Sequence, residues 1–208
     1  VGDMPYLTYQ VCPAEAIRNA GRFLSQAGCD CVKIEVDRRL MKTVEAMSAA
    51  TIPVMAHLGL RPQSIHAVGG YKVQGKHAAA ALRLIEDAQM MESAGAIALL
   101  LEAVPSEVAK IITERASIPV IGIVAGPHVD GQVVVFHDMI GYGGGHPPRS
   151  VKRYAIVHDV LLRAFREYAA DVTNRVFPAT ENSVAMEPKE FDSLTKLLEG
   201  HASEGGNE

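Results

Sequence analysis

The sequence lacks any apolar run approaching the ~20 residues of a membrane-spanning helix, although hydrophobic residues make up 48% of its 208 residues. It also lacks a basic cluster, because its 20 Lys and Arg residues are scattered and its formal net charge is −4. No charged segment followed by an apolar stretch marks a secretory signal at the start. These absences argue against a membrane protein and against a nucleic-acid-binding protein, which needs a basic face.

Cysteine is scarce, and the three residues present (Cys12, Cys29 and Cys31) make an odd number. Cys29 and Cys31 are alternate residues of one extended segment, roughly 6–7 Å apart at their Cα atoms, and do not bridge easily. We therefore expect a reduced, cytoplasmic protein. The glycine-rich segments match neither a P-loop nor a dinucleotide fingerprint, so nucleotide binding is not supported.

Short β-rich runs alternate with longer helical patterns, which is typical of parallel βα units. The predicted strands are residues 1–3, 31–35, 52–56, 96–101, 118–123 and 132–136, and the predicted helices are residues 13–26, 40–50, 77–94, 105–116 and 150–174. The strands are continuous apolar runs, as in sheets covered on both faces.

The chain begins without methionine, inside an apolar segment, so we expect one or two βα units to be missing from its start. With them, residues 1–178 would form an α/β domain of the TIM (β/α)8 barrel type, incomplete here at its N-terminus. The alternative is an open, doubly wound sheet, for which six strands suffice. Residues 179–208 are acidic and are predicted to form a peripheral tail.

Polar residues end four consecutive predicted strands: Asp3, then Lys33 with Glu35, then His57, then Glu102. Functional groups gather at the carboxyl ends of parallel strands. Lys33 and Glu35 are two residues apart, so both point to the same side of the sheet. Asp3 and Glu35 would share a hard cation such as Mg²⁺, which takes one or two protein carboxylates. Zinc is not predicted, because histidines and cysteines do not cluster at these ends.

Glu102 follows four apolar residues, and desolvation there is expected to raise its pKa toward the range of a general base. Each of these residues also has a purely structural interpretation. Lys33 and Glu35 would form an internal ion pair, Asp3 a turn or cap, Glu102 a carboxylate at the rim, and His57 a hydrogen-bonded core histidine.

Several segments carry a resemblance to a known family. The most specific is Gly69-Gly-Tyr-Lys-Val-Gln-Gly75, preceded by Pro53-Val-Met-Ala-His-Leu-Gly-Leu-Arg-Pro-Gln-Ser, with Asp3-Met-Pro-Tyr, Val32-Lys-Ile-Glu35 and Leu101-Glu-Ala-Val-Pro105 in support. From residue 1 to about residue 180, the sequence resembles the ketopantoate hydroxymethyltransferase (3-methyl-2-oxobutanoate hydroxymethyltransferase) family.

The resemblance implies a TIM barrel in which Asp3 and Glu35 bind Mg²⁺, together with an aspartate of an upstream Val-Gly-Asp-Ser segment that this chain does not contain. It further implies that Asp3, Lys33 and His57 bind substrate and that Glu102 is the catalytic base. The implied reaction transfers a hydroxymethyl group from 5,10-methylenetetrahydrofolate to 3-methyl-2-oxobutanoate through a Mg²⁺-stabilised enolate. The product, 2-dehydropantoate, belongs to pantothenate and coenzyme A biosynthesis. Family members are homo-oligomers, commonly decamers.

Two departures from the family stand out. Val36-Asp37-Arg38-Arg39 follows Glu35 where glycines are usual, and Val124 replaces a usual glycine. One alternative function is a related Mg²⁺-dependent α-keto-acid barrel lyase, although the sequence lacks the reactive-cysteine loop expected of that group. Another is a barrel domain that has kept the fold and lost catalysis.

Overall fold

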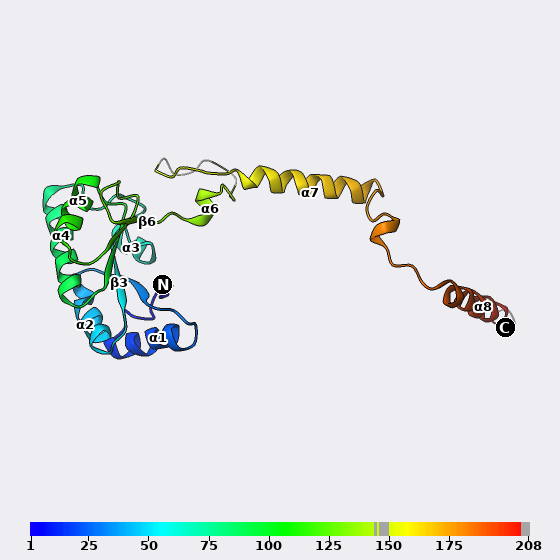
Figure 1. Cartoon of the computed structure of the whole chain (residues 1–208), viewed down its shortest axis with the longest axis horizontal. Coiled ribbons are helices and arrows are strands. Elements are labelled where there is room, and N and C mark those ends of the chain that lie inside the picture. Colours follow the sequence, from blue (N-terminus) through cyan, green and yellow to red (C-terminus); the bar gives the residue numbers. More distant parts are fainter. Residues whose placement is uncertain (144, 146–149, 205–208) are drawn as a thin grey trace. The chain divides into compact units, whose positions relative to one another are not determined.

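The structure is a computed structural model that describes residues 1–143, 145 and 150–204. The described residues fall into two compact units, one of residues 1–139 and 150–153, the other of residues 140–143, 145 and 154–204. Figure 1 shows the elements of both along the chain. No helix among the described residues is long and apolar enough to cross a membrane.

The first unit contains a six-stranded parallel sheet. Its strands are β1 (Gly2–Asp3), β2 (Val32–Glu35), β3 (Val54–Gly59), β4 (Ala98–Glu102), β5 (Val120–Ile123) and β6 (Gly131–Gln132). Its helices are α1 (Pro13–Ser25), α2 (Met41–Ala49), α3 (Ile65–Val68), α4 (Ala78–Ser93), α5 (Ser106–Arg115) and α6 (Phe136–Met139), with the 3₁₀ turns η1 (Arg38–Leu40) and η2 (Pro62–Ser64). The predicted α/β class with a parallel sheet is confirmed.

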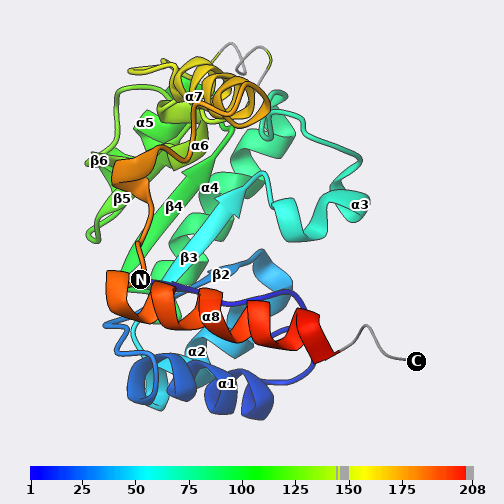
Figure 2. The ribbon, with the colours of Figure 1, turned by 90° about the vertical axis from the view of Figure 1, so that its right-hand side faces the viewer.

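The strands lie in the order β1-β2-β3-β4-β5-β6, each beside its neighbours in sequence. A doubly wound sheet reverses its strand order at a switch point, so this order rules out that alternative. Figure 1 shows α1, α2, α4 and α5 on one face of the sheet, and Figure 2 shows β2, β3 and β4 side by side. Sequential order with helices on one face is the arrangement of a barrel wall. Closure into a TIM barrel stays a prediction.

The hydrophobic core lies between the sheet and these helices. The strands contribute Val32, Ile34, Val54, Ala56, Leu58, Leu99, Leu101 and Val120, and the helices contribute Val44, Met47, Ile85, Met91, Val108 and Ile112, among others. Burying each large side chain contributes roughly 1.5–3 kcal/mol. Because successive strand residues point to opposite faces, the residues between these core positions face away from the helices.

Most element boundaries differ from the sequence prediction by one or two residues, and three differences matter most. Strand β3 runs to Gly59, so His57 lies inside the strand and not at its end. The strand predicted over residues 132–136 is limited to Gly131–Gln132, and the chain enters α6 at Phe136. The helix predicted over residues 150–174 is shorter and begins later, as α7 (Val157–Thr173).

The second unit contains α7, the 3₁₀ turn η3 (Thr180–Asn182) and α8 (Pro188–Glu204). No residue of α7, all of which the structure describes, is buried. The rings of Tyr168 and Phe177 meet edge to face, with centroids 5.8 Å apart. Residues 205–208 of the predicted tail lie outside the described residues, and the predicted domain boundary at residue 178 stays a prediction.

Val124 has a φ of +55°, in the left-handed region that favours glycine. Left-handed backbone costs an ordinary residue roughly 1–2 kcal/mol. Replacement by glycine removes this cost, but the greater flexibility of glycine in the unfolded chain offsets about half of the gain. We expect Val124→Gly to raise the free energy of unfolding by about 0.5–1 kcal/mol, as measured by urea denaturation. Val133→Gly is the control: Val133 is also exposed but has no positive φ, and its replacement should lower stability. Equal losses in both variants would contradict the prediction.

Candidate active site

The five predicted site residues share the face of the sheet that points away from the helices. Asp3 is the register partner of Lys33, and Glu35 is the register partner of His57. Glu102 ends the next strand, β4. All five alternate along the chain with core residues such as Met4, Ile34 and Leu101. The sheet therefore gathers them at one face, over four neighbouring strands.

Asp3 and Lys33 form an ion pair across β1 and β2. The Lys33 Nζ lies 2.6 Å from Asp3 Oδ1; the Lys33 side chain is largely buried and that of Asp3 is exposed. Within the described residues no ion pair joins Lys33 to Glu35, so the internal pair considered from the sequence is replaced by one between strands. The ammonium of Lys33 is thus held on the site face beside a carboxylate.

Glu35 is only 4% exposed. Both of its carboxylate oxygens accept hydrogen bonds from the backbone N–H of Gln63, at 3.0 and 3.1 Å. Burial raises the pKa of Glu35, the Gln63 N–H and the charges of His57 and Lys33 oppose that rise, and the negative charge of Asp3 adds to it. A further positive charge near Glu35 and Asp3 would therefore stabilise the ionised carboxylate.

His57 is buried, and its Nε2 lies 3.2 Å from Glu102 Oε2. The two atoms are close enough for an ion pair but are not oriented for a hydrogen bond, and neither ring nitrogen of His57 has a hydrogen-bond partner among the described residues. A buried polar atom without a partner costs roughly 1–3 kcal/mol. The interpretation of His57 as a hydrogen-bonded core histidine is therefore not supported. A bound molecule that supplied a donor or acceptor would relieve this cost.

The carboxylate of Glu102 is the more accessible member of that pair. Its side chain is 20% exposed, against 3% for His57. Its strand is held on both sides, by Gly59 of β3 and Ile123 of β5. Glu102 can therefore reach a molecule on the site face while its backbone stays fixed.

Sequence reasoning missed two residues that hold Glu35. The hydroxyl of Tyr9, which is fully buried, donates to Gln63 Oε1 at 2.8 Å and accepts from the backbone N–H of Glu35 at 3.1 Å. Burial raises the pKa of Tyr9, so the hydroxyl keeps the proton that it donates. Gln63 stands in the Leu-Arg-Pro-Gln-Ser part of the family-like segment, a signal that could have found it. Tyr9 carries no such signal.

Arg61 and Asp37 brace the turn that carries Gln63. The Arg61 guanidinium donates to Asp37 Oδ2, and Arg39 Nη2 lies 2.6 Å from the same oxygen. Burial would raise the pKa of Asp37, but hydrogen bonds from Arg39 and Arg61 outweigh it and hold the pKa well below its usual range. The segment that departs from the family after Glu35 is therefore fixed by ionic contacts.

The oxygen donors of the site suit a hard cation. Within the described residues no group of three or more His, Cys, Asp or Glu side chains is placed to hold a metal ion. Asp3 and Glu35 supply two carboxylates whose like charges raise the pKa of Glu35. Mg²⁺ needs no more than one or two protein carboxylates and takes its other ligands from water and substrate. The donor set of these two residues therefore fits Mg²⁺.

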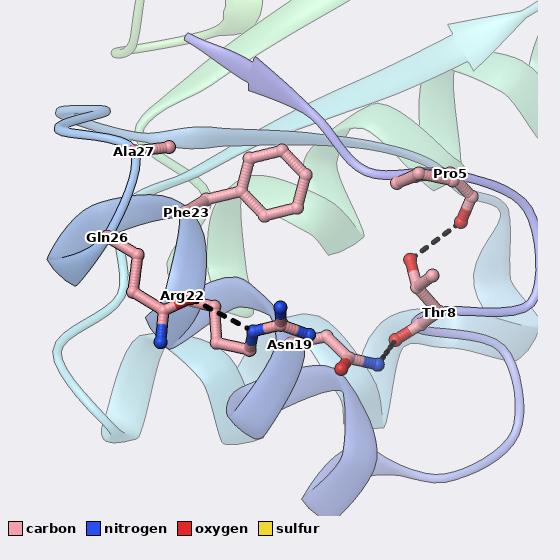
Figure 3. A pocket seen from close by; sticks show the side chains of 7 residues that line it. All are labelled: Pro5, Thr8, Asn19, Arg22, Phe23, Gln26 and Ala27. Atoms are coloured by element: carbon pink, nitrogen blue, oxygen red, sulfur yellow. Dashed lines mark hydrogen bonds between the residues drawn. The ribbon is translucent and has the colours of Figure 1, made fainter.

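Besides a hollow of about 280 Å³ lined by Asp37, Gly59 and Arg61 among others, two further hollows lie near these elements in the described part of the chain. One of about 350 Å³ is shown in Figure 3 and is lined by Pro5, Thr8, Asn19, Arg22, Phe23, Gln26 and Ala27. Its polar groups already bond one another, Asn19 to the Thr8 carbonyl and Arg22 to the Gln26 side chain, and it contains no predicted site residue. The other, of about 470 Å³, is lined by Tyr6 and residues 62–67. It leaves open space beside the turn that holds Glu35.

Residues 1–180 match the sequence model of a family described as ketopantoate hydroxymethyltransferase. The 3-methyl-2-oxobutanoate hydroxymethyltransferase of Syntrophomonas wolfei is 46% identical over 194 residues, which are 93% of this chain and 70% of that protein. The enzyme of the same name from Geobacillus sp. (strain WCH70) is also 46% identical, with the same coverage. Among solved structures, phosphonopyruvate hydrolase is 12% identical with a TM-score of 0.49, covering 99% of this chain and 71% of that one.

Proposed function

Because the chain belongs to the ketopantoate hydroxymethyltransferase family, we propose that it transfers a hydroxymethyl group from 5,10-methylenetetrahydrofolate to 3-methyl-2-oxobutanoate. The overall reaction consumes one water and gives 2-dehydropantoate and tetrahydrofolate. The observation that supports it best is the meeting of Asp3, Lys33, Glu35, His57 and Glu102 on one face of the sheet. By family resemblance, we expect a closed TIM barrel and a cytoplasmic homo-oligomer, commonly a decamer.

Asp3 and Glu35 would hold Mg²⁺ on this face. When bound, the cation would act as a Lewis acid on the keto oxygen and acidify the neighbouring C–H bond. Lys33, already on the site face beside Asp3, would meet the negative charge of the substrate carboxylate. The backbone N–H of Gln63 would keep the Glu35 carboxylate ionised and oriented.

Glu102 would take the proton from C3 of the keto acid onto its Oε2. A positioned general base contributes typically ~10²–10⁴-fold to the rate. His57 lies 3.2 Å from that oxygen and has ring nitrogens without hydrogen-bond partners in the described part of the chain. It would bind a polar atom of the substrate and keep the Glu102 carboxylate in place.

The test separates the two halves of the reaction. The purified protein is given Mg²⁺ and keto acid in deuterium oxide without folate, and exchange at C3 is followed by NMR. In a second assay 5,10-methylenetetrahydrofolate is added and 2-dehydropantoate is measured by mass spectrometry. We expect Mg²⁺-dependent exchange and product. If both exchange and product are absent, the result would favour the alternative of a catalytically inactive barrel domain. Exchange without product would contradict the proposed folate-dependent step.

Asp3→Asn is expected to weaken the binding of Mg²⁺ and of keto acid together, each by about 10–100-fold, the range found when groups around a metal are changed. The variant removes one of the two carboxylate charges and leaves Lys33 without its ion-pair partner. Isothermal titration calorimetry measures both affinities. Asp30→Asn, an exposed position just before β2, is the control. Unchanged affinity for both ligands in Asp3→Asn would remove Asp3 from the metal site.

A further inference from the structure

The side chain of Gln63 connects the two strand ends that carry the candidate metal ligands. Its Nε2 donates to the carbonyl of Met4, the residue after Asp3, at 2.9 Å. Its Oε1 accepts from the Tyr9 hydroxyl, which in turn accepts from the backbone N–H of Glu35. One amide therefore bridges the end of β1 and the end of β2 through hydrogen bonds alone.

The backbone of Gln63 adds a third connection, because its N–H binds both carboxylate oxygens of Glu35. Tyr9 and Glu35 are buried, so water cannot readily replace these bonds. The Arg61–Asp37 pair fixes the same turn from its other side. A carboxylate held at both oxygens, on a backbone held by a buried hydroxyl, has little freedom to move relative to Asp3.

We propose that Gln63 and Tyr9 form a clamp that sets the separation of the Asp3 and Glu35 carboxylates and so makes the site selective for a small divalent cation. This inference rests on the proposed function, which places the cation between those two carboxylates. Mg²⁺ demands a near-ideal octahedron with short bonds of about 2.0–2.1 Å, whereas Ca²⁺ accepts longer bonds of about 2.3–2.6 Å and flexible geometry. A rigid pair of carboxylates favours Mg²⁺, and a loosened pair loses that preference. Gln63 and Tyr9 are thus positioning residues that act through Glu35 and Met4.

Two variants test the clamp. Tyr9→Phe keeps the ring and removes only the hydroxyl that bonds Gln63 and Glu35. Gln63→Ala keeps the backbone N–H on Glu35 and removes the bridge to Met4 and Tyr9. The matched controls are Tyr168→Phe on α7 and Gln89→Ala on α4, both exposed and neither among the predicted site residues. Calorimetry with Mg²⁺ alone and with Ca²⁺ alone gives the two affinities, and thermal unfolding shows that each variant is folded.

We expect each clamp variant to lose about 10-fold or more in Mg²⁺ affinity and much less in Ca²⁺ affinity, so that the ratio of the two falls. The controls should keep the wild-type ratio. Equal losses for both cations, or no loss, would overturn the clamp. If Gln63→Ala does not fold, Tyr9→Phe decides alone, because it preserves volume. Failure of the wild-type protein to bind Mg²⁺ would instead refute the metal site of the proposed function.

Discussion

Glu102→Gln is expected to slow Mg²⁺-dependent proton exchange at C3 of the keto acid by about 10²–10⁴-fold, the typical contribution of a general base. The amide has nearly the shape of the carboxylate but cannot accept a proton from carbon. Glu102 lies beside His57 and is the more exposed of the two, so the substitution changes the chemistry of one atom and little of the packing. Binding of the keto acid should therefore be retained.

NMR in deuterium oxide measures the exchange, and calorimetry measures keto acid binding. Glu107→Gln is the matched control, because Glu107 is an exposed glutamate in the first turn of α5, close in sequence but outside the site. Exchange at the wild-type rate in Glu102→Gln would show that another group takes the proton. Loss of substrate binding with loss of exchange would make Glu102 a binding residue.

Gly59→Ala should have the largest effect on stability, lowering the free energy of unfolding by about 3 kcal/mol or more. A Cβ at Gly59 would lie 2.3 Å from the Glu102 carbonyl oxygen and 2.8 Å from a methyl carbon of Val104, and the φ of Gly59 is +91°. Unfavourable backbone costs roughly 1–3 kcal/mol and overpacking another 1–3 kcal/mol. The backbone of Glu102 must also shift, so Gly59→Ala protein that folds should show slower proton exchange at C3 of the keto acid.

Urea denaturation gives the stability of this variant. Gly21→Ala is the control, since Gly21 lies in α1, where an added Cβ would have no described atom within 4 Å apart from its chain neighbours and the nearby backbone of its own helix, and has no positive φ. Alanine should stabilise that helix by about 0.5–1 kcal/mol. If Gly59→Ala is as stable as the wild type, the prediction is wrong and the backbone between β3 and β4 accommodates an added methyl group.

The parallel sheet and the face on which the site residues lie could be predicted from the sequence because both follow from local periodicity. Lys33 and Glu35 alternate with Val32 and Ile34, and this alternation alone places them opposite the core. The partner of Lys33 could not be predicted in the same way. It depends on the register of β1 against β2, which pairs Asp3 with Lys33.

The contacts that support Glu35 could not be predicted from periodicity, although Gln63 lies in a family-like segment. Gln63 and Tyr9 are separated by 54 positions, and Gln63 and Glu35 by 28. Both contacts depend on the path of loops that carry no periodic pattern. The end of β3 was missed for a related reason, since His57-Leu58-Gly59 continues the strand beyond the apolar run that marked it.

The alternation of core and site residues along β2 also bears on how this protein can change in evolution. A substitution at Lys33 or Glu35 alters chemistry and leaves the core intact, because Val32 and Ile34 still face the helices. Deletion or insertion of one residue within the strand would exchange the two faces, since the side-chain period is two. Charged groups would then enter the core as valine and isoleucine left it. We expect variation in these strands to arise by point substitution, with changes in length confined to the loops.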